Sequence, residues 1–347
     1  MPTIVNLWKS RLCFVFAIAS LSGALVAEDR QTIGVGLKLR AKDTLAPKAE
    51  TGQDALACLN ALVWEPSEFE VRVEQAESKH GDWLLRFPSA RPVGDANNDL
   101  VAVEWYQAKD KAKSPIYAPA AVIVHESGSG MAVGRLIAAG LSRKGVHTFM
   151  VQLPNYGKRR SPSGKPSGEN LSASMVQGIA DVRRAKDAVA TLSLVDTSRI
   201  SLQGTSLGGF VASTTAGLDD GFHRVFLLLS GGDIYGVVMN GKKDASKMRE
   251  ELEQGGISGK QVKELFHCVE PMRLAHRIQA EKTWLFSGEY DDVVPMENAY
   301  LLANKIPLEP SHHVVMAADH YSGILFLPII VQQIHDHMIE TAAPQAP

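Results

Sequence analysis

The sequence predicts an α/β fold with a mostly parallel central sheet and helices on both faces. From residue 120 onward, short apolar runs alternate with amphipathic stretches of helical period. One of these runs, 120–124, is apolar at every position, which is typical of a strand buried on both faces. A further run, 199–210, passes through a glycine-flanked Ser206 and predicts a strand, a sharp turn and a helix.

The composition is that of an ordinary globular protein. The chain has 347 residues, of which 45% are hydrophobic and 21% are charged, which suits one large α/β domain or two small ones. Its formal net charge is -2, and the basic residues are scattered along the sequence. A nucleic-acid-binding surface needs clustered positive charge, so we expect no nucleic-acid partner.

The first residues have the pattern of a secretory signal peptide. Lys9 and Arg11 precede an apolar run over 12–26, small residues lie near its end, and Glu28 is the first acidic residue. We therefore expect residues 1–27 to be removed, leaving a secreted or periplasmic protein with no stable membrane insertion. A single membrane anchor is the alternative, although the run is short for a membrane span.

Export would place the two cysteines that remain, Cys58 and Cys268, in an oxidising compartment. The spacing leaves two alternatives open, one disulfide or two buried thiols. Neither cysteine has the spacing of a zinc site.

Residues 28–67 are weakly patterned and are expected to form an N-terminal extension, with a short helix around 54–63. After it, apolar residues alternate with polar ones over 69–73, 83–87 and 101–105. This period of two predicts three antiparallel strands ahead of the parallel sheet.

The parallel part begins with a strand over 120–124 and a helix that ends at Gly145. A strand over 146–153 and a long helix over 171–194 follow. The apolar stripe of this helix leaves its remaining positions to charged side chains, namely Asp181, Arg183, Arg184, Lys186 and Asp187. We expect the later elements to be strands over 222–229, 283–286 and 312–316 and helices over 296–304 and 324–339.

An insertion over 233–281 interrupts this alternation, with short helices expected over 244–253 and 258–266. It follows a strand end, where a lid over a pocket would lie, so a lid and a helical excursion without a gating role are both possible. Residues 68–340 form the predicted main domain, and 341–347 are a C-terminal tail.

The turn after the strand over 199–205 has the form Gly-x-Ser-x-Gly, typical of a nucleophile elbow. A serine can project from such a strained turn only if its neighbours are almost free of side chains, as Gly204 and Gly208 are. The helix that begins at Leu207 would direct its free N–H groups at negative charge developing next to Ser206.

An acid and a histidine follow two later strands. Asp291 lies just beyond 283–286, and His320 lies just beyond 312–316, so both fall at the sheet edge where open α/β sheets bind ligands. Two other acids are candidates for the same role: Asp292 adjoins the first, and Asp233 also follows a strand.

The chain order serine, acid, histidine resembles that of the α/β-hydrolase superfamily. Three motifs resemble its dienelactone-hydrolase-like and prolyl-oligopeptidase-like branch. They are Asp-x-x-Arg-Ile at 196–200, His-Glu at 125–126 and Gly-x-x-Asp-x-x-Val-Pro at 288–295. The resemblance covers roughly residues 69–340.

This resemblance implies that Ser206 is the nucleophile, that His320 exchanges its proton and that Asp291 orients the imidazole. It also implies that the backbone N–H groups of Leu207 and Ser127 form an oxyanion hole. In this interpretation His125 shapes the loop before Ser127. No metal or organic cofactor is required.

The function that follows is a secreted serine hydrolase acting on a carboxylic ester through an acyl-enzyme intermediate, with a small-molecule or saccharide-linked ester as substrate. A peptidase of the same branch, a binding protein without turnover, and a haloperoxidase-type or carbon–carbon-cleaving enzyme are alternatives. Arg159 and Arg160 are either ligands for an anionic substrate or solvated loop charges.

Overall fold

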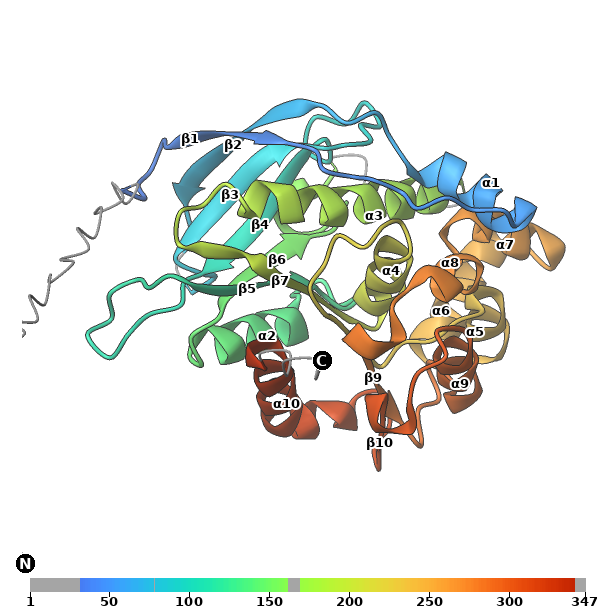
Figure 1. The fold of residues 1–347 in the computed structure, drawn as a ribbon. Coiled ribbons are helices and arrows are strands. Elements are labelled where there is room, and N and C mark those ends of the chain that lie inside the picture. The colour runs from blue at the N-terminus through green and yellow to red at the C-terminus, as the bar shows by residue number, and fades with distance from the viewer. Residues whose placement is uncertain (1–31, 78, 162–168, 341–347) are drawn as a thin grey trace, which may run out of the picture. The chain divides into compact units, whose positions relative to one another are not determined.

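The computed structural model describes residues 32–77, 79–161 and 169–340. The predicted signal peptide, 1–27, and the C-terminal tail, 341–347, lie outside the described residues. A ten-stranded sheet runs in the order β1-β2-β3-β4-β6-β5-β7-β8-β9-β10 (Figure 1). The strands are β1 (Lys38–Lys42), β2 (Glu68–Gln75), β3 (Trp83–Pro88), β4 (Leu100–Tyr106), β5 (Ala118–Val124), β6 (His147–Gln152), β7 (Val195–Thr205), β8 (Val225–Leu228), β9 (Thr283–Gly288) and β10 (His313–Met316).

The sheet is antiparallel from β1 to β6 along this order and parallel from β6 to β10. This confirms the predicted mostly parallel sheet with antiparallel N-terminal strands. The α-helices are α1 (Gln53–Leu62), α2 (Ala132–Ser142), α3 (Glu169–Val189), α4 (Leu207–Ala216), α5 (Ile234–Asn240), α6 (Asp244–Gln254), α7 (Lys260–Leu265), α8 (Pro271–Leu274), α9 (Met296–Lys305) and α10 (Leu327–Ile339). Among the described helices, none is both long and apolar enough to cross a membrane.

Strand β5 shows why the core has two layers. Its alternate side chains point to opposite faces, so Val122 and Val124 join the cluster that includes side chains of α3 and α4, whereas Ile123 joins the cluster that includes side chains of α2 and α10. Figure 1 shows these two pairs of helices on opposite faces of the sheet. A run that is apolar at every position is therefore required here.

The N-terminal extension contributes to the same core. The expected helix is present as α1, but the sequence analysis did not predict β1, which pairs antiparallel with β2. Its pattern Lys-Leu-Arg-Ala-Lys buries only Leu39 and Ala41. This strand is too short and too charged to stand out by composition.

Helix α3 differs more strongly from expectation, because most of its charged side chains are buried. Arg183 pairs with Asp219 at 2.8 Å, and Arg184 pairs with Asp43 in the segment after β1. The helix is therefore covered on its polar side by segments distant in sequence. Each buried charge has an opposite charge beside it, as burial requires.

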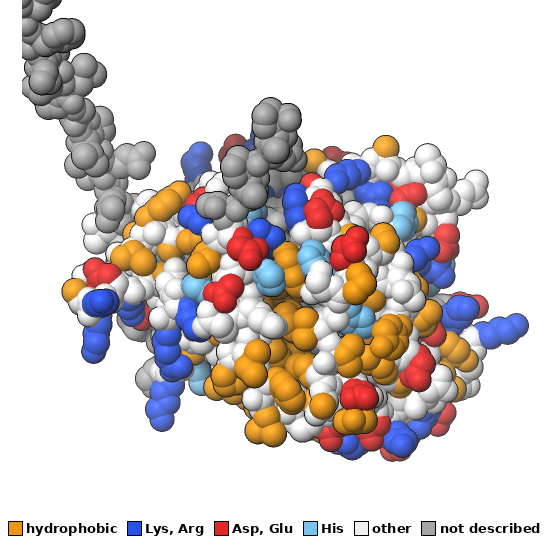
Figure 2. Space-filling model, turned by 60° about the horizontal axis from the view of Figure 1, so that its bottom comes forward, with side chains coloured by type: hydrophobic (Ala, Val, Ile, Leu, Met, Phe, Trp, Pro, Cys, Tyr) orange, Lys and Arg blue, Asp and Glu red, His pale blue; other side chains and the backbone are white. Residues whose placement is uncertain are grey.

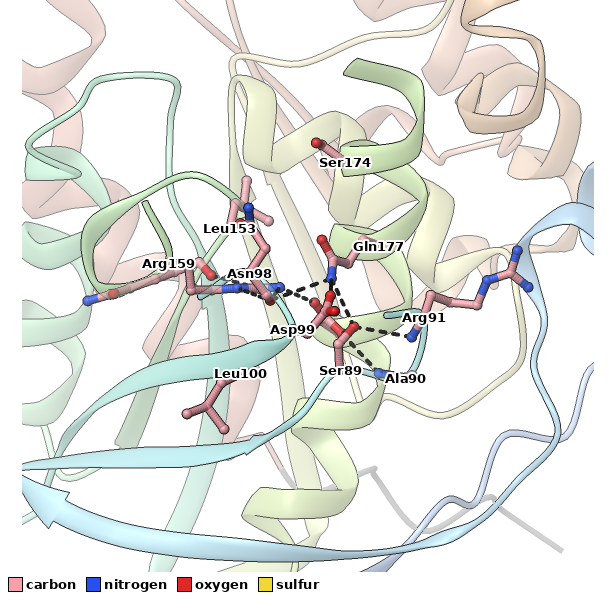
Figure 3. Close-up of polar contacts among 12 residues, drawn as sticks. Ser89, Ala90, Arg91, Asn98, Asp99, Leu100, Leu153, Arg159, Ser174 and Gln177 are labelled. Carbon is pink, nitrogen blue, oxygen red and sulfur yellow. Dashed lines mark hydrogen bonds and ion pairs between the residues drawn. The ribbon is translucent and has the colours of Figure 1, made fainter. Parts of the chain in front are cut away.

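A third buried pair joins α3 to the loop after β6. Arg159 is fully buried, lies 2.6 Å from Asp181 and donates to the carbonyl oxygen of Asn98 at 3.0 Å. Figure 3 shows Arg159 and Asn98 meeting Ser89 and Gln177 in one polar cluster between the β3–β4 connection and α3. The sequence analysis interpreted Arg159 as a substrate ligand or as a solvated loop charge. Both interpretations are wrong, because the buried guanidinium can reach neither a substrate nor solvent.

The neighbouring arginines provide a test of this buried pair. Replacing Arg159 by Met leaves the Asp181 carboxylate buried without its partner, so we expect a loss of about 3–5 kcal/mol in the free energy of unfolding. Arg160→Met is the matched control, because Arg160 is exposed and should change stability by less than about 0.5 kcal/mol. Urea unfolding of both variants measures the difference, and equal effects would contradict the assignment.

Candidate active site

The turn after β7 holds Ser206 in a backbone conformation that side-chain-bearing residues rarely adopt, with φ 52° and ψ −118°. A Cβ atom on Gly204 would lie 2.2 Å from the carbonyl oxygen of Gly208, and one on Gly208 would lie 2.2 Å from that of Val124. Both glycines are therefore required by close backbone contacts. The second contact also presses the elbow against the end of β5.

The structure brings Ser206, His320 and Asp291 together at the carboxyl ends of β7, β9 and β10. Ser206 Oγ lies 2.9 Å from His320 Nε2, and His320 Nδ1 lies 2.7 Å from Asp291 Oδ2. An ionised carboxylate only accepts hydrogen bonds, so Nδ1 carries the proton of the neutral ring. The lone pair on Nε2 is then free to accept the hydroxyl proton of Ser206.

The geometry separates the three acids that the sequence left open. Asp291 is held in place because its Oδ1 accepts from the N–H groups of Val293 and Val294, each at 2.9 Å. Asp292 instead forms an ion pair with Lys243, and Asp233 caps helix α5. Only Asp291 among them bonds to His320.

His125, after β5, fixes the direction of the next peptide group. Its Nε2 accepts from the N–H of Leu153 at 3.1 Å, so the neutral ring carries its proton on Nδ1, which donates to the carbonyl oxygen of Glu126 at 2.6 Å. In a trans peptide the N–H points opposite to the C=O. The N–H of Ser127 therefore points away from the buried His125 ring.

Two further side chains hold this loop, and the sequence analysis missed both roles. The carboxylate of Glu126 accepts from the N–H groups of Val133 and Gly134 at the start of α2, each at 3.1 Å. Tyr156 donates its hydroxyl to the carbonyl oxygen of Ser127 at 3.0 Å. Both peptide groups that flank Ser127 are thus fixed, although nothing in the local sequence indicates these long-range partners.

The second expected backbone donor, the N–H of Leu207, lies at the elbow. Leu207 is the first residue of α4, and the first N–H groups of a helix have no acceptor within it. Gly208 lies against the carbonyl oxygens of Val124 and His125. The start of α4 and the loop before Ser127 are therefore neighbours, which suits two N–H groups directed at one oxyanion.

Exposed apolar side chains follow His320 in the chain. Directly after His320, the 3-10 helix Ser322–Phe326 and the start of α10 expose Ile324, Leu325 and Ile329, with Leu325 77% exposed. Figure 2 shows apolar side chains gathered on one face, with histidines and charged groups nearby. Within the ranges that the structure describes, no cluster of side chains is arranged to hold a metal ion.

Cys58 lies on α1, and Cys268 lies in the 3-10 helix His267–Val269 that follows α7. Cys58 is buried and its Sγ lies 3.1 Å from the carbonyl oxygen of His267, next to Cys268. Both are free thiols in the structure. Burial raises the pKa of Cys58 to about 12, so this thiol stays protonated at neutral pH.

Comparisons with known proteins identify what this chain is similar to. The family model of the prolyl oligopeptidase family matches residues 174–323, which contain all three side chains of the Ser206 site. An acetyl xylan esterase from Paenibacillus sp. R4 superposes with a TM-score of 0.59 at 18% identity, over 84% of this chain and 96% of that one. No curated protein sequence matches the chain.

The chain has the α/β-hydrolase fold. Acetyl xylan esterase 1 from Thermoanaerobacterium sp. JW/SL YS485 gives a TM-score of 0.60 at 16% identity, over 86% of this chain and 97% of that one. A puromycin-hydrolyzing peptidase from Mycobacterium tuberculosis gives 0.54 at 13% identity, over 78% of this chain but 45% of that one. The expected resemblance to the prolyl-oligopeptidase-like branch of the α/β-hydrolases is confirmed, and the family match supports a serine hydrolase.

The pH dependence of stability tests the role of His125 in this hydrolase fold. Burial lowers the pKa of His125 to about 4, whereas an unfolded histidine titrates near pH 6.5. The unfolded state therefore binds a proton first as pH falls, and folding stability is lost between about pH 6.5 and 4. Between pH 7 and 5 we expect this group to remove about 2 kcal/mol from the free energy of unfolding.

Denaturant unfolding at both pH values, in the wild type and in His125→Gln, measures this contribution. The variant lacks the titrating ring, so its stability should fall by less over the same interval. Equal losses in the two proteins would show that His125 is not held neutral by its burial.

Proposed function

We propose that this chain is a serine hydrolase that cleaves carboxylic esters through an acyl-enzyme intermediate. The observation that carries the proposal is the hydrogen-bonded series from Ser206 Oγ through the His320 ring to Asp291. A serine hydroxyl in a strained elbow has no structural need for a histidine and a carboxylate in series behind it. The same series is what activates a serine hydroxyl for attack on a carbonyl carbon.

In the first half of the reaction, Ser206 Oγ attacks the ester carbonyl while His320 Nε2 accepts the hydroxyl proton. Asp291 stabilises the imidazolium that results and keeps its orientation. The N–H groups of Leu207 and Ser127 donate to the oxyanion of the tetrahedral intermediate, and each donor is worth about a hundredfold in rate or more. His320 then gives its proton to the departing alcohol.

In the second half, a water molecule takes the place of the alcohol. His320 accepts one proton of this water as its oxygen attacks the acyl carbon bonded to Ser206 Oγ. Collapse of the second tetrahedral intermediate returns the proton to Ser206 and releases the carboxylic acid. The neutral tautomer with its proton on Nδ1 is restored.

The structural neighbours favour an ester substrate over a peptide. The two acetyl xylan esterases superpose with TM-scores of 0.59 and 0.60, against 0.54 for the puromycin-hydrolyzing peptidase. We therefore propose a small acyl group, on a small alcohol or a saccharide, as the substrate class. A faster turnover of p-nitrophenyl acetate and acetylated sugars than of aminoacyl anilides supports this, and the opposite order favours the peptidase.

We further propose that the mature protein is exported. The support is the charge and hydropathy pattern of residues 1–27. Amino-terminal sequencing of the protein from fractionated cells distinguishes a cleaved leader from a retained anchor.

Covalent labelling tests the nucleophile. We expect a fluorophosphonate probe to label the wild type and to leave Ser206→Ala unlabelled, because the probe reacts only with an activated hydroxyl. Circular dichroism confirms that the variant is folded. An unreactive, folded wild type would instead indicate a binding protein without turnover.

The acid is tested by three amide substitutions. Asp291→Asn should lower kcat by about 10⁴-fold, because an amide favours the wrong tautomer of His320. Asp233→Asn keeps the helix cap and should leave kcat within about twofold. Asp292→Asn should cost no more than about tenfold, because Asp292 pairs with Lys243 and not with His320. A larger loss in either of the last two would move the acid role away from Asp291.

A further inference from the structure

The turn between α5 and α6, within the insertion, is bonded directly to the loop that carries Asp291. The N–H of Lys242 donates to the carbonyl oxygen of Asp292 at 2.6 Å, and Lys243 Nζ lies 3.0 Å from Asp292 Oδ1. A Cβ atom on Gly241 would lie 2.4 Å from the carbonyl oxygen of Val293. Main chain and side chains of the turn thus lie against the residues that immediately follow Asp291.

The same turn reaches the loop that carries the histidine. Tyr321, which follows His320, donates its hydroxyl to Asp244 Oδ2 at 2.9 Å. Lys243 Nζ lies 5.0 Å from the centroid of the Tyr321 ring, within the range of a cation–π contact. The Tyr321 ring in turn meets the His320 ring edge-on, with centroids 5.7 Å apart. Two consecutive residues of the insertion therefore contact both loops of the site.

The backbone of Lys243 is strained, with φ 53° and ψ −111°. Such a conformation costs about 1–3 kcal/mol in a residue with a side chain and persists only where the surroundings determine it. It resembles the conformation of Ser206. Glycine would avoid this cost, whereas the lysine side chain at this position contacts Asp292 and Tyr321.

We propose that Lys243 and Asp244 are positioning residues, which hold His320 and Asp291 in register by bonding to Tyr321 and Asp292. This inference rests on the proposed hydrolase function, because it concerns how that site is kept assembled. The first residues of α6 then keep their position beside the two loops of the site. Any opening movement of the insertion leaves this turn in place.

The charges around His320 give the proposal a signed test. Asp291 and Asp244 interact with His320 directly, and the ammonium of Lys243 lies among the carboxylates of Asp291, Asp292 and Asp319 on the same two loops. A positive charge nearby disfavours the imidazolium and a negative charge favours it. Removing either Lys243 or Asp244 should therefore lower kcat, because both changes misplace the loops of the site. The two changes should shift proton binding by His320 in opposite directions.

The experiment measures kcat, KM and the pH profile of kcat/KM for p-nitrophenyl acetate in Lys243→Met, Asp244→Asn and Tyr321→Phe. We expect each variant to lose about tenfold in kcat with less than about a twofold change in KM, because misplacement of the reacting groups slows the chemical step. The acid limb should move to higher pH in Lys243→Met and to lower pH in Asp244→Asn.

Matched controls come from exposed residues of the same type, namely Lys263→Met, Glu253→Gln and Tyr300→Phe, which should behave as the wild type. Lys243→Arg keeps the ion pair and should restore most of the rate. Lys243→Gly removes the backbone strain, so it should be at least as stable as the wild type and still show the loss in kcat.

Folded variants with wild-type kcat and unmoved pH limbs would overturn the positioning role. The positioning role would also be overturned if the acid limb of the pH profile moved in the same direction in Lys243→Met and in Asp244→Asn. A wild type that neither reacts with the fluorophosphonate probe nor hydrolyses the ester would contradict the proposed function itself, before any variant is compared.

Discussion

The site depends on one constraint, the backbone conformation of Ser206. At φ 52° this residue stores about 1–3 kcal/mol of strain, and the packed core maintains it. Its N–H donates to the carbonyl oxygen of Leu228 in β8 at 2.8 Å, while Gly204 and Gly208 allow backbone contacts that no other residue permits. Relaxing this turn would withdraw the hydroxyl from His320.

The partners of Ser206 are equally fixed before any substrate binds. Asp291 is oriented by backbone N–H groups, the loop before Ser127 by the buried His125 ring, and the His320 loop by Asp319, which accepts from the N–H groups of Tyr321 and Ser322. Preorganised dipoles of this kind need no rearrangement as charge develops in a transition state. The rigidity of the site thus comes from many ordinary hydrogen bonds between distant segments.

Local patterns predicted much of this architecture. The apolar runs identified β5, β6, β8 and β9, because a strand buried along its whole length needs no partner information, and the glycines around Ser206 marked the elbow. The convergence of Ser206, Asp291 and His320 could be anticipated because each follows a parallel strand, and such strands end at one edge.

The remaining features could not be predicted, because they depend on contacts far apart in the chain. Charged residues on a helix normally indicate a face exposed to solvent. Arg183 and Arg184 are instead buried, and they pair with Asp219 and Asp43 from other segments of the chain. The contacts of Lys243 with the two loops of the site likewise have no local signal. A single sequence shows the composition of such segments but not what covers them.

The account is tested most directly by trapping the acyl-enzyme. The wild type is mixed with p-nitrophenyl acetate, quenched in acid within milliseconds, digested and examined by peptide mass spectrometry. We expect a burst of p-nitrophenol and one acetyl group on the peptide that contains Ser206. Turnover without this adduct, or an acetyl group that forms at another residue at the catalytic rate, would contradict it.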